Sequence, residues 1–250
     1  MKKLLLFALL TLFSIDNNAQ DTLIPVATNT TRNVTDYFKW KSDNVDRNDS
    51  IKIFSLSPIS RRVNRVNGFT MGFGHYENKN IKYQKVNGLN LETSPNGLML
   101  LSVGLTIPFE GLVAGINDNV ISNSSFMDDY AATYIEINGL NISSGGFLGG
   151  AKINGLNISV ITAMNQLNGL SLNASVIDTQ KYNGVSIAGI ANITDYGNGI
   201  QIAPSNVSRN HNGIQIGLFN HSKNLRGIQL GLWNTNGKRK LPLINWQFKA

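Results

Sequence analysis

The sequence contains no cysteine among its 250 residues. This absence excludes disulfide bonds, thiol catalysis, thiolate metal sites and a lipid attached to cysteine. Charged residues are sparse, at 15% of the chain, against the roughly 25% usual in soluble domains. Histidine occurs only at His75, His211 and His221, and no two of these have the spacing of a metal-ligand pair. We therefore expect the core and hydrogen bonds alone to stabilise the fold.

Long apolar runs are also scarce, and the longest one lies at the N-terminus. Lys2 and Lys3 precede twelve apolar residues, Leu4 to Ile15, and a short polar stretch follows as far as Gln20. Twelve helical residues span about 18 Å, which is too short for a hydrocarbon core of roughly 30 Å. We therefore expect residues 1–20 to be a signal peptide, and the protein to be exported to the periplasm, the outer membrane or the cell surface. No later segment is apolar for 18 residues, so we expect no helical membrane span.

Glycine is abundant, with 24 copies, and many of them belong to an internal repeat. The unit Asn-Gly-apolar-polar-apolar recurs every 14 to 16 residues in the second half of the chain. Its clear copies contain Gly139, Gly155, Gly169, Gly184, Gly199, Gly213 and Gly227, and Arg226 replaces the asparagine in the last copy. Weaker copies contain Gly68, Gly88, Gly97 and Gly111.

Each position of the repeat has one chemical character. The residues one and three places after glycine are Leu, Ile or Val, and the residue between them is Asn, Ser or Gln, as at Asn141, Ser171 and Gln215. Such alternation is typical of a β-strand with one buried face, and β-branched residues favour that conformation. Asn-Gly tolerates a positive φ in a sharp turn. The repeat thus predicts an all-β protein in which strands of about five to nine residues alternate with turns.

Two architectures fit this repeat. In a β-solenoid-like stack, each repeat forms one coil, and equivalent residues lie about 4.8 Å apart. Ile and Leu would then fill the interior, and Gln201, Gln215 and Gln229 would form an amide ladder on the outer surface. In a transmembrane β-barrel, the alternative, the apolar positions would face lipid and the Asn, Ser and Gln positions the lumen. The short, uniform connections favour the solenoid, as does Asn-Gly in every repeat, because consecutive barrel turns lie on opposite rims.

We divide the chain into the signal peptide (1–20), a polar N-terminal segment (21–60) with one strand near residues 51–56, and a β repeat domain (61–248). The clear repeats occupy residues 137–234, and an insertion loop is expected at 118–132. Residues 238–250 are expected to cap the stack. In that cap, apolar residues would cover the open end of the core: Leu241, Leu243, Ile244, Trp246 and Phe248. In the barrel alternative, the two aromatic residues would belong to an interfacial girdle.

The segments GIQIGLFN and GIQLGLWN near the C-terminus carry a family resemblance. This repeat unit resembles that of a family of bacterial surface-repeat proteins, and the resemblance covers roughly residues 61–248. It implies an exported protein of a Gram-negative cell envelope. It implies no reaction, and the family offers no catalytic residue to carry over.

Candidates for catalysis are few. The sequence contains neither a G-x-S-x-G elbow nor a P-loop. An enzyme acting on polysaccharide needs several acids or bases on one face, but the acids of the clear repeats, Asp178 and Asp195, are expected in turns and out of phase. His211 and His221 are expected to be solvated turn residues. We therefore predict no enzyme and no catalytic, cofactor-binding or metal-binding residues, with a polysaccharide-active enzyme as the least favoured alternative.

The charge balance indicates an anionic partner. Without residues 1–20, the chain has 20 basic and 14 acidic residues, a net charge of +6. Because an exported protein rarely meets nucleic acid, we expect an anionic glycolipid or glycan of the envelope, or a surface protein, and membrane association is compatible with the same charge. The predicted contact residues are Gln201, Gln215, Gln229, Lys223, Arg226, Lys238, Arg239 and Lys240. The barrel alternative would instead be a pore or an assembly factor.

Overall fold

The computed structural model describes residues 50–74, 83–93, 135–144 and 150–248, which contain strands and no helix. These residues belong to one compact unit, Trp40–Ala250. Its strands are β1 (Ser50–Ser57), β2 (Val63–Gly72), β3 (Gln84–Glu92), β4 (Ile135–Ser143), β5 (Ala151–Ser159), β6 (Thr162–Asn173), β7 (Val176–Ala188), β8 (Ala191–Ile202), β9 (Ser205–Ile216), β10 (Phe219–Asn236) and β11 (Lys240–Gln247).

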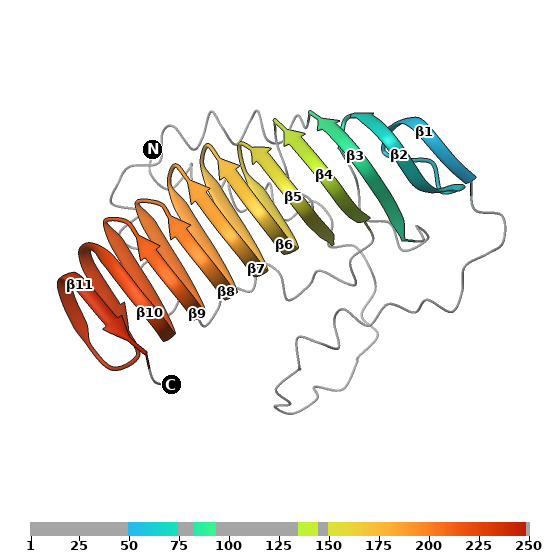
Figure 1. Cartoon of the computed structure of the whole chain (residues 1–250). Helices are drawn as coiled ribbons and strands as arrows, with labels where there is room; N and C mark the ends of the chain where they lie inside the picture. The colour runs from blue at the N-terminus through green and yellow to red at the C-terminus, as the bar shows by residue number, and fades with distance from the viewer. Residues whose placement is uncertain (1–49, 75–82, 94–134, 145–149, 249–250) are drawn as a thin grey trace, which may run out of the picture. The chain divides into compact units, whose positions relative to one another are not determined.

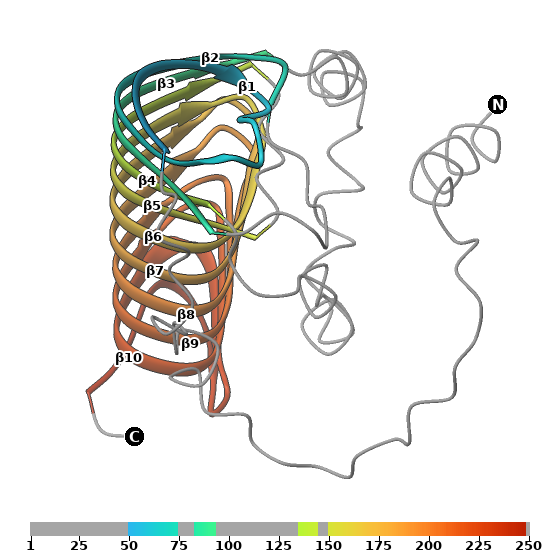
Figure 2. The same cartoon turned by 90° about the vertical axis from the view of Figure 1, so that its right-hand side faces the viewer.

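The described strands form one sheet whose order follows the sequence, from β1 at one end to β11 at the other (Figure 1). Each strand from β1 to β9 is parallel to the next, whereas β10 and β11 are antiparallel. Parallel neighbours require the chain to return after every strand, so the backbone winds as stacked coils (Figure 2). The predicted β-solenoid is therefore confirmed. The barrel alternative is wrong, because β1 and β11 lie at opposite ends of the sheet and do not close it.

Equivalent residues of the repeat stack directly on one another. The glycines of all clear repeats pair with each other in register, and Gly68 and Gly88 extend the same column into β2 and β3. The strands are longer than predicted, since β6 to β9 contain 12 or 13 residues each. The repeat glycine lies inside each strand and not in a turn between strands.

Glycine is required in this column for two reasons. The φ angle of its members is positive, between 130° and 153°, a conformation that residues with a side chain rarely adopt. In addition, a Cβ atom on Gly169 would lie 2.1 Å from the carbonyl oxygen of Gly155 in the preceding coil. The glycine column therefore sets both the backbone geometry and the register of the stack.

The interior has an apolar side and a polar side, separated by the glycine column. The apolar side is formed two places before glycine, where Val66, Val86, Ile137, Ile153, Leu167 and Tyr182 are at most 1% exposed. The polar side is formed two places after glycine, where Asn90, Asn141, Asn157, Ser171, Gln201, Gln215 and Gln229 are also at most 1% exposed. The prediction that Gln201, Gln215 and Gln229 lie on the outer surface is therefore wrong.

The buried polar residues satisfy one another along the stack. Asn141 Nδ2 donates to Asn157 Oδ1 at 2.7 Å, and Asn157 Nδ2 donates onward to Ser171 Oγ at 2.8 Å. Near the C-terminus the hydrogen bonds point in the opposite direction, toward the preceding coil. Gln229 Nε2 donates to Gln215 Oε1 at 2.8 Å, and Gln215 Nε2 donates to Gln201 Oε1 at 2.7 Å. A paired amide avoids most of the desolvation cost of burial, which explains how this column lies inside.

The alternate residues, Leu, Ile and Val, consequently point outward. One and three places after glycine, they form two parallel columns across all described strands, which we call the apolar strip. The first column is Phe54, Phe69, Leu89, Leu140, Leu156, Leu170, Val185, Ile200, Ile214, Ile228 and Trp246. The second is Leu56, Met71, Leu91, Ile142, Ile158, Leu172, Ile187, Ile202, Ile216, Leu230 and Ile244. The prediction that these residues fill the interior is wrong.

The last strand ends the parallel stack by reversing direction. β11 pairs antiparallel with β10, and Asn245 Nδ2 donates to Gln229 Oε1 at 2.9 Å, which closes the internal amide ladder. The apolar residues of this segment do not cover the core, since Leu243 is 67% exposed and Trp246 is 47% exposed. The predicted signal peptide and the insertion loop 118–132 lie outside the described residues.

The glycine column generates a testable prediction. Gly169→Ala places a methyl group against the Gly155 carbonyl and should lower the free energy of unfolding by more than about 3 kcal/mol, as severe steric clashes do. Gly74→Ala is the control, because φ there is also positive, at 99°, but the nearest atom to an added Cβ is 3.7 Å away. Urea unfolding followed by circular dichroism measures both variants. Equal destabilisation by the two substitutions would show that the close approach of the glycines does not limit the fold.

Candidate functional site

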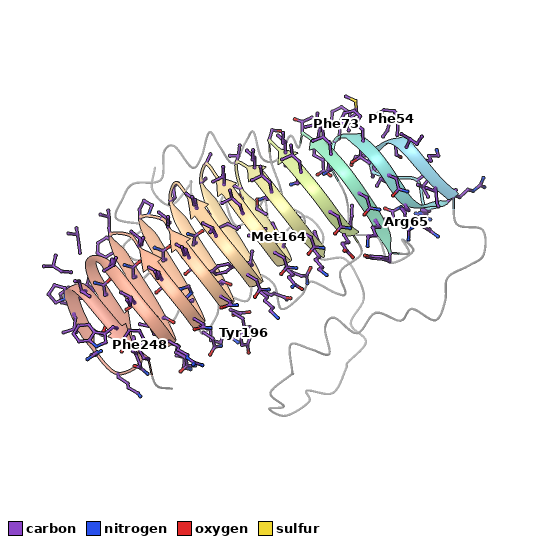
Figure 3. The ribbon with its side chains drawn as sticks, viewed as in Figure 1. Phe54, Arg65, Phe73, Met164, Tyr196 and Phe248 are labelled. Carbon is purple, nitrogen blue, oxygen red and sulfur yellow. The ribbon has the colours of Figure 1, made fainter. Side chains whose placement is uncertain are left out.

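An open groove of about 760 Å³ crosses the middle of strands β7, β8 and β9 and the first half of β10. Its lining comes from the three positions before the repeat glycine, from Lys223, from the connection between β10 and β11, and from the end of β11. The lining residues are Lys181, Asn183, Tyr196, Gly197, Asn198, Asn210, His211, Asn212, Lys223, Asn224, Leu225, Arg226, Gly237, Lys238 and Gln247. Tyr196, labelled in Figure 3, stands at the edge of the sheet opposite to Phe54 and Phe73.

A row of asparagines on the outer surface leads into this groove. The asparagine before each repeat glycine donates from Nδ2 to Oδ1 of its equivalent in the preceding coil, at 2.6 to 2.8 Å from Asn87 to Asn183. In the groove the same contacts lengthen to 3.5 Å for Asn198 and 3.2 Å for Asn212. The amides in the groove are therefore held less tightly by their neighbours, and they can donate to a ligand at a lower cost.

The groove is cationic. Four of its lining residues are basic, namely Lys181, Lys223, Arg226 and Lys238, and none of the described lining residues is acidic. Arg226 occupies the position at which the preceding repeats have asparagine, so the amide row ends in a guanidinium. Arginine and lysine form their strongest hydrogen bonds with carboxylates and phosphates. The arrangement therefore suits an anionic ligand that also carries neutral hydrogen-bonding groups.

A buried pair of aromatic side chains supports the groove. Gly197 of β8 leaves space for Tyr182 of β7 to reach His211 of β9, with the Tyr182 hydroxyl 3.3 Å from His211 Nδ1. A Cβ atom on Gly197 would lie 2.5 Å from the tyrosine ring. Burial lowers the pKa of His211 to about 4, although the backbone of Ile214 opposes this shift, so the imidazole is neutral near pH 7. The prediction that His211 and His221 are solvated is wrong, since they are 1% and 6% exposed.

The structure separates the predicted contact residues into three groups. Lys223, Arg226 and Lys238 line the groove. Gln201, Gln215 and Gln229 are internal and cannot contact a partner in the folded protein. Arg239 and Lys240 are exposed outside the groove, and the Arg239 guanidinium lies 4.9 Å from the Trp246 ring centroid, at a cation–π distance.

The two acids of the clear repeats lie in strands and not in the predicted turns. Asp178 is in β7 and Asp195 in β8, and neither lines the groove. Burial raises the pKa of Asp178 to about 7, with a smaller contribution from the charge of Asp195. Asp195 forms an ion pair with Arg209 at 3.3 Å. Among the described residues, no cluster of three metal-ligating side chains occurs.

Four lining residues, Lys181, Tyr196, Asn210 and Asn224, were not predicted from the sequence. They stack on one another three places before the repeat glycine, a position with no constant chemical character along the repeat. The register of the strands identifies them. When the repeat glycines are aligned, these side chains form one column beside the asparagine row.

Comparison of the chain with models of protein families, with curated proteins and with solved structures finds no match. The resemblance to bacterial surface-repeat proteins therefore stays a prediction. Within the described part of the chain, no helix has the length and apolar character needed to cross a membrane.

The two shifted pKa values should give opposite pH dependences of stability. The folded pKa of His211 is about 4 against an ordinary value of 6.5, so the unfolded state takes up a proton first as the pH falls. Stability from neutral His211, about 3 kcal/mol by linkage, is present above pH 6.5 and lost toward pH 4. For Asp178 the folded pKa is the higher one, so its contribution is present below pH 3.8 and is lost as the pH rises to about 7.

Urea unfolding of two variants between pH 4 and 7 separates these slopes. The substitution His211→Leu introduces leucine, which the next coil has at the equivalent position, Leu225. In this variant only the pH dependence caused by Asp178 remains, so the free energy of unfolding should fall as the pH rises. In Asp178→Asn, the histidine dependence remains and stability should rise over the same interval. Identical pH profiles for the two variants and the unmodified protein would contradict this account.

Proposed function

We propose that the protein is an exported, non-enzymatic repeat protein of a bacterial cell envelope that binds an acidic saccharide in the groove, either a glycan or the head group of a glycolipid. One observation carries the proposal: the groove combines four basic side chains with a row of loosened amides and has no acidic residue among its described lining.

The chemistry of an acidic saccharide matches each part of the groove. Its carboxylate, sulfate or phosphate groups accept charge-assisted hydrogen bonds from Lys181, Lys223, Arg226 and Lys238. Its hydroxyl groups both donate and accept, as do the side chains of Asn198 and Asn212. The ring of Tyr196 is 38% exposed and offers an apolar surface for one face of a sugar. The asparagine side chains recur from coil to coil, about 4.8 Å apart, so the groove suits an extended ligand along the stack.

The charge of the described residues favours an anionic partner. The described residues include 13 Lys and Arg but only four acids, Glu92, Glu136, Asp178 and Asp195, a balance of 13 − 4 = +9. Glu92 and Glu136 are buried and the two aspartates are half-buried, so no described acid is fully exposed. A surface of one sign attracts oppositely charged partners over distances near the Debye length, about 8 Å at physiological salt.

The geometry favours binding over catalysis at this place. Hydrolysis of a glycosidic bond requires a pair of carboxyl groups beside the substrate, but Asp178 and Asp195 lie outside the groove. His211 lies beneath the groove with an exposure of 1%, and its Nδ1 faces the hydroxyl of Tyr182. Among its described lining residues, the groove therefore offers cations and amides, which bind, and no carboxyl group or exposed histidine for proton transfer.

Two matched double variants test the groove. Lys223→Gln with Arg226→Gln removes two charges inside the groove, whereas Lys52→Gln with Arg61→Gln removes two exposed charges outside it. We expect the groove variant to bind polygalacturonate at least about tenfold more weakly, because each lost charged hydrogen bond costs about 1.5 kcal/mol or more. The control should stay within about twofold, since it changes only the long-range field. Isothermal titration calorimetry of the protein purified from the envelope measures both.

Neutral dextran serves as the second probe in this experiment. Binding of polygalacturonate that weakens equally in the groove variant and the control would show that net charge alone attracts the polymer, and the groove would then have no specific role. Equal affinity of the unmodified protein for polygalacturonate and dextran would exclude an acidic saccharide as the ligand.

A further inference from the structure

The groove does not explain the apolar strip on the outer surface. Its two columns contain 22 residues from eleven strands, and none of them is polar or charged. Eleven strands have ten spacings of about 4.8 Å, so the strip is about 48 Å long. In Figure 3, Phe54 and Phe73 mark the strand ends on this side of the sheet, and Arg65 lies toward the opposite ends.

The strip does not serve the interior of the solenoid. The core contains the residues two places before glycine, the internal amide ladder and further buried residues such as Ile135, Met164 and Ile177, and none of these belongs to the strip. Members from both halves of the strip, such as Ile142, Ile158 and Ile216, remain 36% to 39% exposed. Polar residues would be accepted at these positions, as they are in the neighbouring outer row of asparagines. An apolar surface of this length indicates a contact with another apolar phase.

Basic and aromatic residues flank the strip at both ends. At the first end, Lys52 is exposed two places before Phe54, whose ring stacks on Phe69 at 5.6 Å. At the other end, Lys238, Arg239 and Lys240 are exposed, and Arg239 lies over Trp246, which belongs to the strip. Tryptophan at a boundary beside lysine and arginine is typical of the interface between acyl chains and anionic head groups.

We propose that the apolar strip lies on the surface of a lipid bilayer that contains anionic lipids. The Leu and Ile side chains enter the region between head groups and acyl chains, and the flanking Lys and Arg side chains pair with the lipid phosphates. The column three places before glycine contains four basic residues, Arg65, Lys85, Lys152 and Lys181, interrupted by Glu136 and Gln166. These basic residues lie about 13 Å from the strip along the strands and reach the same head groups. Of these cations, Lys181 and Lys238 also line the groove, whereas the strip itself has no residue in common with it.

Two triple variants test the contact with lipid. The substitutions Ile142→Thr, Ile158→Thr and Ile216→Thr make the strip more polar, whereas valine at the same three positions keeps it apolar. Threonine and valine have similar shapes and both favour strands, so the pair separates polarity from packing. The probe is flotation with vesicles of phosphatidylcholine containing about one quarter phosphatidylglycerol, an anionic surface.

We expect the threonine variant to bind these vesicles at least about tenfold more weakly than the unmodified protein, and the valine variant to stay within about twofold. Vesicles of phosphatidylcholine alone should bind the unmodified protein more weakly, because the head-group charge is missing.

Tryptophan fluorescence gives a second measurement. In a Trp40→Phe background, the fluorescence of Trp233 and Trp246 should shift to shorter wavelength when anionic vesicles are added. Binding of polygalacturonate should be the same for both triple variants, which separates this test from that of the groove.

Three results would overturn the proposal. The first is equal vesicle binding by the threonine and valine variants, which would place the contact elsewhere. The second is the absence of vesicle binding by the unmodified protein. The third is a dimer, detected by sedimentation, that the threonine variant dissociates while neither variant binds vesicles, since the strip would then pair with a second copy of the chain.

Discussion

Stacking in exact register is the constraint on which the rest of this structure depends, and the glycine column imposes it. A carbonyl oxygen of each glycine lies so close to the glycine of the next coil that no side chain fits between them, as the 2.1 Å separation calculated for a Cβ on Gly155 or Gly169 shows. The positive φ at the same positions is a second reason why residues other than glycine are excluded there. A slip by one residue would bring a side chain against a carbonyl, so every strand is aligned with its neighbour by its glycine.

Once the register is set, each side chain stacks about 4.8 Å from the equivalent side chain of the next coil. Inside the solenoid, amide side chains can stack in this way because each donates a hydrogen bond to the next. On the outer surface, apolar side chains can stack because they pack against one another. Like charges repel when they stack directly, and the basic row is accordingly interrupted: Glu136 lies between Lys85 and Lys152, with Lys85 Nζ 3.6 Å from its Oε1. Although burial acts to raise the pKa of Glu136, the Tyr83 hydrogen bond and the two lysines hold that pKa below its ordinary value.

The sequence was sufficient to predict the fold class, but not which face of each strand lies inside the solenoid and which lies on its outer surface. Alternation after Gly213 shows that Ile214 and Gln215 face opposite sides of the sheet, and the constant spacing predicts a stack. Alternation alone does not say which side is internal, and the usual rule that apolar residues face inward placed Gln215 wrongly. The rule failed because a stacked amide finds both its partners in the adjacent coils. The groove was partly predictable: Lys223, Arg226 and Lys238 stand out by charge, whereas Tyr196 and Lys181 become neighbours only through the register.

The central claim is that the amides of the sheet lie inside the solenoid and the apolar residues lie outside. Thiol labelling tests this claim most directly, because the chain has no cysteine of its own. Two single variants, Gln215→Cys and Ile216→Cys, place a thiol on opposite sides of the same strand. With a water-soluble maleimide under native conditions, the thiol at position 216 should react rapidly and the thiol at 215 only after unfolding in urea, since these positions are 39% and 0% exposed. Rapid labelling at 215 and protection at 216 would contradict the account and place the apolar residues inside.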